Sequence, residues 1–166
     1  MPPCFTRIVC TAFLAFALTS SWCATTTAEE AGAGLSDGGL VKVRSAYPMG
    51  ETISRLKEDI ASKKLMFFSE IDQARLAADA GIKLNPATLL VFGNPALGSQ
   101  FMTSNPAAGI DWPVRLLVFE DAKGHVWLVY TDFAYIARRH HIVDRDEAFA
   151  KASTVIGSIA SAVSAK

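Results

Sequence analysis

The chain has 166 residues, 51% of them hydrophobic and 19% charged, and its 16 Lys and Arg balance its 16 Asp and Glu. This length fits one compact domain. The apolar fraction excludes intrinsic disorder, which requires low hydrophobicity and high net charge. The balanced charge argues against a general nucleic-acid binder, because such proteins carry a basic excess that neutralises phosphates.

Residues 1–28 are predicted to form a secretory signal peptide. Arg7 supplies the positive start, and residues 8–18 form an uncharged apolar run of 11 residues. A membrane-spanning helix needs about 20 apolar residues, so a cleaved signal is favoured over an anchor. We therefore expect export to the periplasm or the medium, with no membrane span after cleavage.

Cleavage after Ala28 is favoured, because it puts Thr26 and Ala28 at the two positions where signal peptidase accepts small residues. A lipoprotein anchored through Cys23 is disfavoured, since bulky Trp22 precedes it. The chain's three cysteines all lie within residues 1–28. The mature chain is thus expected to have neither a disulfide nor a thiol nucleophile.

Residues 29–39 are rich in Gly, Ala and Ser and are predicted to be a flexible tether. Residues 40–166 are predicted to form a single domain. Its expected elements, in chain order, are a strand at 40–46, a helix at 51–64, a strand at 65–71, a short helix at 72–80 ended by Gly81, a strand at 87–92, a helix at 95–102, a loop at 105–111, a hairpin of strands 114–120 and 125–131, and helices at 133–140 and 144–164.

Several local signals mark these boundaries. Asp72 and Asn94 suit helix N-caps, and Pro95 suits a first helical position. Gly124 permits the positive φ that the hairpin turn needs. Asp144 and Glu147 resemble a capping box at the start of the last helix. That helix is expected to lie on a sheet, and a dimer contact is the alternative.

The mixture of hairpin and helices predicts an α+β fold, an antiparallel sheet with helices packed on it. Over residues 49–142 the chain also resembles the bacterial domain-of-unknown-function family 302. The matching stretches are ETISRLKEDIASKKLMFFSEID at 51–72, FGNP at 92–95, GIDWPVRLLVFED at 109–121, Val126 with Tyr130, and RRHHI at 138–142. The resemblance implies a β-α-β(4)-α arrangement, similar to the TATA-binding-protein-like fold class, and implies no activity.

Two departures from the family limit what the resemblance carries over. Many relatives have His where this chain has Gln73, so any metal or proton-transfer role of that His is lost here. Another branch has Cys in the loop that is Gly93-Asn94-Pro95 here, so thiol chemistry does not transfer.

The candidate ligand-binding residues are polar residues beside apolar strands, together with a glycine in the turn that leads into a predicted helix. They are Gly93, Asn94, Asp111, Arg115, Tyr130, Arg138 and His140. Each also has a structural explanation: Asn94 as a cap, Asp111 as a loop-shaping residue and Arg115 on a solvated strand face. His125, His140 and His141 lack the spacing of a metal site, so no metal or cofactor is expected.

Two functions remain open from the sequence. The favoured one is a non-catalytic module of the cell envelope, monomeric or homodimeric, that binds a small molecule or an envelope protein. The alternative is a hydrolase-like enzyme with His140 or His141 as its base, although no nucleophile-elbow motif or phosphate loop supports it.

Overall fold

Six strands form one antiparallel sheet in the computed structural model, which describes residues 34–35 and 38–165. Their order across the sheet is β1-β2-β6-β5-β4-β3. The strands are β1 (Gly34–Leu35), β2 (Leu40–Arg44), β3 (Met66–Asp72), β4 (Ala87–Gly93), β5 (Val114–Glu120) and β6 (Val126–Thr131). The helices are α1 (Met49–Ser62), α2 (Gln73–Asp79), α3 (Pro95–Ser104), the 3₁₀ helix η1 (Pro106–Asp111), α4 (Phe133–Arg139) and α5 (Asp146–Ser161).

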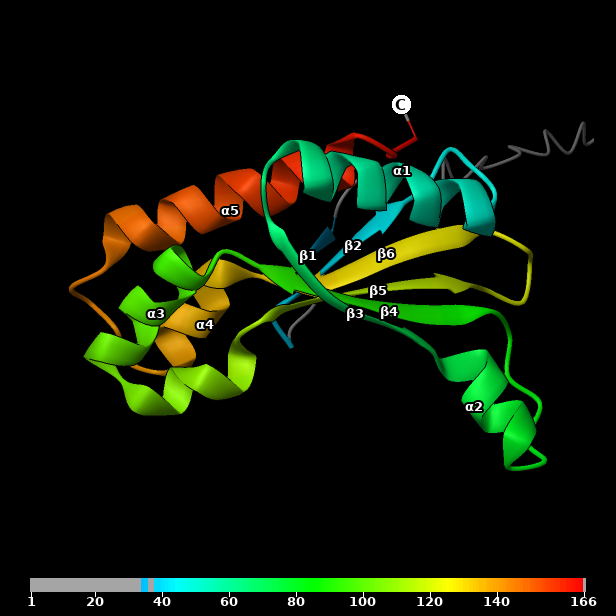
Figure 1. The fold of residues 1–166 in the computed structure, drawn as a ribbon, viewed down its shortest axis with the longest axis horizontal. Coiled ribbons are helices and arrows are strands. Elements are labelled where there is room, and N and C mark those ends of the chain that lie inside the picture. Colours follow the sequence, from blue (N-terminus) through cyan, green and yellow to red (C-terminus); the bar gives the residue numbers. More distant parts are fainter. Residues whose placement is uncertain (1–33, 36–37, 166) are drawn as a thin grey trace, which may run out of the picture.

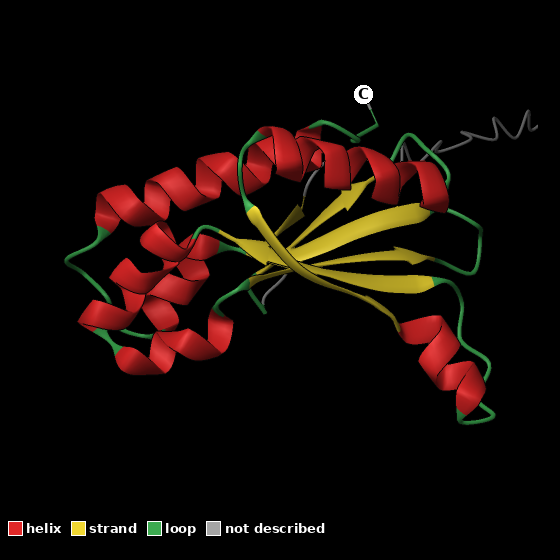
Figure 2. Cartoon of the chain, in the orientation of Figure 1, coloured by secondary structure: helices red, strands yellow, loops and turns green. Residues whose placement is uncertain are grey.

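The succession β2, α1, β3 to β6, α5 is the expected β-α-β(4)-α arrangement, with the shorter helices inserted between its strands. The α+β prediction is therefore confirmed. Figure 1 shows α1 and α5 together on one face of the sheet, while α3, α4 and η1 gather at one end of it. Figure 2 shows α2 projecting from the opposite end, where β3 finishes.

The core lies between the sheet and the pair α1 and α5. Strand β6 alternates buried and half-buried residues, and its buried set, Val126, Leu128 and Tyr130, faces the helices. Leu56 and Ile60 of α1 and Ile159 of α5 are 0 to 1% exposed and cover this set. A strand's period of two and a helix's period of 3.6 thus place the apolar residues on facing sides.

Most predicted boundaries agree with the structure to within two residues. Asp72 Oδ1 accepts a hydrogen bond from the Arg75 N–H at 2.9 Å and caps α2. Gly81 and Gly124 have the positive φ values, 76° and 79°, that their turns require. Helix α1 begins earlier than predicted, at Met49, directly after Pro48.

The capping box predicted for the last helix is wrong. Helix α5 spans Asp146–Ser161, not 144–164, and its N-cap, Arg145, makes no side-chain capping bond. Asp144 is bound elsewhere: its Oδ1 accepts from Ser104 Oγ at 2.5 Å, and its Oδ2 pairs with Arg145 at 2.7 Å.

The segment predicted as a loop at 105–111 contains η1. Asn105 Oδ1 accepts from the Ala107 N–H at 3.0 Å and starts this helix, with Pro106 at its first position. At the other end of the chain, β1 pairs with β2, so the predicted tether at 29–39 includes two residues that belong to the sheet. The predicted signal peptide, residues 1–28, lies outside the described residues.

Candidate functional site

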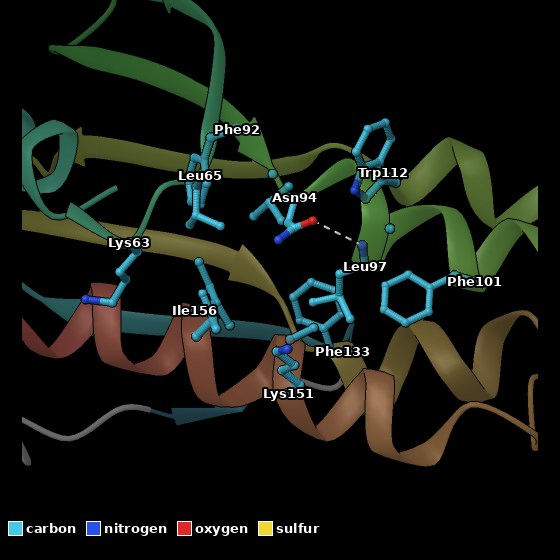
Figure 3. A pocket seen from close by; sticks show the side chains of 15 residues that line it. Lys63, Leu65, Phe92, Asn94, Leu97, Phe101, Trp112, Phe133, Lys151 and Ile156 are labelled. Atoms are coloured by element: carbon cyan, nitrogen blue, oxygen red, sulfur yellow. Dashed lines mark hydrogen bonds between the residues drawn. The ribbon is translucent and has the colours of Figure 1, made fainter. Parts of the chain in front are cut away.

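A cavity of about 290 Å³ opens where the end of β4, the start of α3 and the side of α5 meet. Figure 3 shows its lining from close by. Its residues come from five parts of the chain: Lys63, Leu65, Phe92, Gly93, Asn94, Leu97, Gly98, Phe101, Trp112, Val114, Phe133, Lys151, Ala152, Val155 and Ile156. We call it the α3–α5 pocket. Its volume is at the lower end of the range of about 300 to 1,000 Å³ typical of small-molecule sites.

The inner wall of the pocket is apolar and rigid. Phe101 and Phe133 lie with ring centroids 6.0 Å apart, and Phe101 stacks on Phe149 at 4.2 Å. These three rings and Ile156 are all at least 94% buried. Aromatic side chains packed this way hold their positions, so the wall is preformed for an apolar group.

Trp112 forms another wall and is seated in a notch made by two glycines. A Cβ atom at Gly98 would lie 1.8 Å from Trp112 Nε1, and one at Gly93 would lie 3.3 Å from it. Phe68, displaced by the β-bulge between Phe67 and Ser69, meets the Trp112 ring edge-on at 5.8 Å. Within the described part of the chain, the Trp112 indole N–H has no hydrogen-bond acceptor.

Asn94 connects β4 to α3 at the pocket. Its Oδ1 accepts a hydrogen bond from the Leu97 N–H at 3.2 Å, and Pro95 follows as the first helical residue. This confirms Asn94 as the N-cap. Because the cap uses Oδ1, the amide NH₂ group remains for a ligand.

Two lysines border the pocket. Lys63 lies 2.7 Å from both carboxylate oxygens of Asp59, one turn earlier in the chain. Lys151, on the exposed side of α5, forms no ion pair with any described residue. Figure 3 shows these lysines on either side of Ile156, with Asn94 and Trp112 across the pocket. Lys151 is therefore the uncompensated positive charge of the site.

A buried carboxylate stands directly before Trp112. Asp111 is 3% exposed at its side chain, and its Oδ2 lies 2.7 Å from Nε2 of buried His140. Arg139 Nη1 contacts both Asp111 oxygens at 3.2 Å, and Arg115 Nη2 contacts Oδ1 at 3.3 Å. We call these four residues the Asp111 network. It joins the end of η1 to β5 and α4, and so fixes the position of Trp112.

The network has the geometry of a structural ion cluster. A buried charge needs partners that replace its hydration, and Asp111 has three. His140 meets no Ser, Thr or Tyr hydroxyl among the described residues, so no activated nucleophile accompanies the pair. The described residues also contain no group of three His, Cys, Asp or Glu that could hold a metal ion.

Comparison with known proteins places this chain in a family. The family model described as "Domain of unknown function DUF302" matches residues 41–165. The chain belongs to the DUF302 family. The match extends beyond the resemblance at 49–142 to include most of β2 and all of α5, the helix that carries Lys151.

Curated proteins that resemble this DUF302 chain carry the name of an ion channel. "Fluoride-specific ion channel FluC 1" of Brucella suis biovar 1 is 38% identical over 110 residues, which is 66% of this chain and 43% of that protein. "Fluoride-specific ion channel FluC 2" of Brucella melitensis biotype 1 is equally similar, with 41% of its length covered. The chain thus spans less than half the length of these relatives. Among its described residues, no helix is long and apolar enough to cross a membrane.

A solved structure shares the fold of this DUF302 domain. The crystal structure of an uncharacterised conserved DUF302 protein from Bacillus stearothermophilus superposes with a TM-score of 0.69 at 17% sequence identity. The superposition covers 75% of this chain and 98% of that one. At this identity the likeness concerns the fold alone.

The candidate residues chosen from the sequence lie in different places within the DUF302 domain. Gly93 and Asn94 line the α3–α5 pocket. Asp111, Arg115 and His140 meet in the network behind it. The α3–α5 pocket itself is lined by neither Arg115 nor His140.

The other two candidates lie away from the pocket. Tyr130 packs in the core, where burial raises the pKa of its hydroxyl. Arg138 borders a separate shallow groove with His141, between α4 and α5.

Four residues that border the pocket or hold the network were not among the candidates predicted from the sequence: Lys63, Trp112, Arg139 and Lys151. One sequence signal could have identified Trp112. It is a large aromatic residue between Asp111 and Pro113, just before a predicted strand, and such a residue is unusual in a solvated loop. The others are charged residues on helices and look like ordinary solvated positions.

Proposed function

We propose that this chain is an exported, non-catalytic domain that binds a small molecule in the α3–α5 pocket. The observation that carries the proposal is the combination of a rigid aromatic wall with Trp112, whose indole N–H has no partner among the described residues. Pockets that are largely apolar, with a few polar groups to orient the ligand, are typical of small-molecule sites.

The non-catalytic part of the proposal is supported by the Asp111 network. Catalysis by a histidine base needs a substrate or nucleophile within hydrogen-bond reach of the imidazole. His140 instead points Nε2 at Asp111, and the cavity that Asp111 and Arg115 line has a volume of only about 10 Å³. This volume is far below the roughly 300 Å³ at which small-molecule sites begin, so it leaves no room for a substrate. The hydrolase alternative thus lacks a substrate site at His140.

The name of the curated relatives does not define the ligand. Fluoride is small and strongly hydrated, and an aromatic wall cannot replace its water. The lining of the α3–α5 pocket suits a larger, partly apolar molecule instead. Fluoride therefore serves as a control ion in the binding experiments below.

Native mass spectrometry of the protein purified from its own host tests the proposal. We expect a reproducible mass excess of a few hundred daltons at most, the scale set by the cavity. A Leu97→Trp variant, which fills the pocket, should lose the excess, whereas Leu76→Trp on exposed α2 should keep it. A bare mass in the unchanged protein, or an excess that survives Leu97→Trp, would contradict the proposal. The same spectrum distinguishes a monomer from a homodimer.

Export is tested separately. Cell fractionation followed by N-terminal sequencing should find the protein outside the cytoplasm with Glu29 as its first residue, as cleavage after Ala28 requires. A chain that retains Met1 or Arg7 in the cytoplasm would refute the export part and leave the binding part intact.

A further inference from the structure

The polar side chains that line the α3–α5 pocket are N–H donors: the ammonium groups of Lys63 and Lys151, the Trp112 indole and the Asn94 amide. No Asp or Glu among the described residues lines the pocket. Asn94 is the one of these residues with a side-chain acceptor, and its Oδ1 is already bonded to the Leu97 N–H. The lining side chains thus offer a ligand donors and no unused acceptor, which favours a ligand whose polar end accepts hydrogen bonds.

The charge of the ligand follows from Lys151. Asp59 already neutralises Lys63, with both carboxylate oxygens 2.7 Å from its ammonium group. Lys151 has no such partner among the described residues, although it lies beside the apolar lining. An anion bound there forms a charge-assisted hydrogen bond, which is about twice as strong as a neutral one. A neutral ligand leaves that interaction unused.

The size of the ligand follows from the cavity. Its 290 Å³ equals the liquid volume of about ten water molecules, since each occupies about 30 Å³. The rings of Phe101 and Phe133 and the side chain of Ile156 accept only apolar groups. A bare anion such as acetate or fluoride would leave this wall uncovered.

From these three observations we infer that the α3–α5 pocket binds an apolar monocarboxylate of about ten non-hydrogen atoms, with its carboxylate at Lys151 and its body against the aromatic wall. The inference rests on the proposed function and specifies its ligand class. Trp112 and Asn94 lie across the pocket from Lys151 and so border the apolar chain of the ligand rather than its carboxylate (Figure 3).

Octanoate is the probe, because it has an apolar chain, one carboxylate and the required size. We would titrate it into the full chain labelled with ¹⁵N and follow the indole N–H signals, assigned with single Trp→Phe variants. The Trp112 signal should shift. The Trp127 signal should not, because its Nε1 donates to Asp121 Oδ2 at 2.9 Å on the hairpin and lies outside the pocket.

Three other ligands separate the parts of the inference. Octanol has the same apolar chain without the charge. It should bind roughly tenfold more weakly than octanoate, the ratio expected when one charge-assisted hydrogen bond is lost. Acetate has the carboxylate without the long apolar chain, and fluoride is the control ion. Neither should shift the Trp112 signal at concentrations that saturate octanoate binding.

Lys151→Glu tests the placement of the carboxylate. It should weaken octanoate binding by roughly tenfold or more and leave octanol binding unchanged. Lys123→Glu, the same charge change on the exposed hairpin turn, should leave both unchanged. Because Lys151 is exposed, its variant should keep the fold, which the unchanged Trp127 signal would report.

Each failure has its own meaning. Octanol binding as tightly as octanoate, or octanoate binding that ignores Lys151→Glu, would overturn the carboxylate inference while keeping a small-molecule site. Acetate binding as tightly as octanoate would replace the apolar ligand with a simple anion and overturn the inference too. No Trp112 shift with octanoate or octanol at millimolar concentration would overturn the inference, whereas the proposed function would fall only if the protein from its own host also showed a bare mass.

Discussion

Trp112 occupies the space that a side chain at Gly98 would need. A Cβ atom there would lie 1.8 Å from Nε1 and 2.3 Å from Cδ1 of the indole. No real contact is this short, so helix α3 accepts only glycine at this turn if Trp112 is to remain in place. The pocket wall thus depends on a residue that contributes no side chain.

Gly98→Ala should therefore destabilise the protein, whereas Gly157→Ala in α5 should stabilise it. Nothing lies within 4 Å of a Cβ at Gly157, so alanine there gains helix propensity of about 0.5 to 1 kcal/mol. At Gly98 the displaced indole should cost about 1 to 3 kcal/mol. Urea unfolding of both variants measures the difference. A stabilised Gly98→Ala protein would mean that Trp112 is free to move.

Removing the charge of the Asp111 network should lower the stability of the protein without preventing it from folding. Asp111→Asn keeps the size of the side chain but removes the charge that His140 and Arg139 contact. We expect the free energy of unfolding to fall by about 1 to 3 kcal/mol, the usual penalty for breaking buried charged hydrogen bonds. Asp79→Asn, at an exposed position near the end of α2, is the control and should change little. Equal stabilities would show that the network contributes nothing.

Asn94 should contribute to stability through its side-chain oxygen. Asn94→Ala removes the capping bond to the Leu97 N–H and should cost about 1 kcal/mol. Asn94→Asp keeps an acceptor at the same place and should restore most of that loss. Thermal unfolding of the unchanged protein, Asn94→Ala and Asn94→Asp at one pH compares their stabilities. If Asn94→Asp were as unstable as Asn94→Ala, the capping bond would not explain the effect.

The hairpin turn should make stability depend on acid pH. The hydrogen bond from Trp127 Nε1, followed by that from the His125 N–H, lowers the pKa of Asp121 well below its usual value. A folded-state pKa below the unfolded value of about 3.9 stabilises the protein above that pH, and this contribution is lost as pH falls through the folded-state pKa.

Asp121→Asn tests this dependence. The variant should be less stable than the unchanged protein at pH 7, and the difference should shrink as the pH is lowered below about 4. Urea unfolding at pH 7, 5, 4 and 3 follows it. A difference that stays constant over this series would exclude the Asp121 charge as its cause.

Features set by neighbouring residues were predictable from the sequence, and those set by the tertiary fold were not. The caps at Asp72 and Asn94 and the turn at Gly124 depend on residues within a few positions, and all three were correct. Asp144 had the right local pattern for a cap, but Ser104, 40 residues earlier, takes its carboxylate. Local rules cannot include such a competitor.

The same distinction explains the site. Asp111 and His140 were both candidates, but their contact spans 29 residues and no periodicity links them. Arg139, and not the candidate Arg138, pairs with Asp111, since one position on a helix turns a side chain to another face. Lys151 belongs to the site only because α5 passes beside α3, which the sequence of α5 does not reveal.

The pairing of β2 with β6 has a consequence for synthesis of the protein. Residues 40–44 hydrogen-bond with residues 127–131, and the Ala46 N–H bonds to the carbonyl oxygen of Val163. The ribosome makes the second partner of each pair late, so β2 has only the two-residue strand β1 beside it in the sheet until most of the chain has emerged. Pairings of such long sequence separation also form slowly. A chain that crosses a membrane unfolded would have this interval in which to reach the translocation machinery.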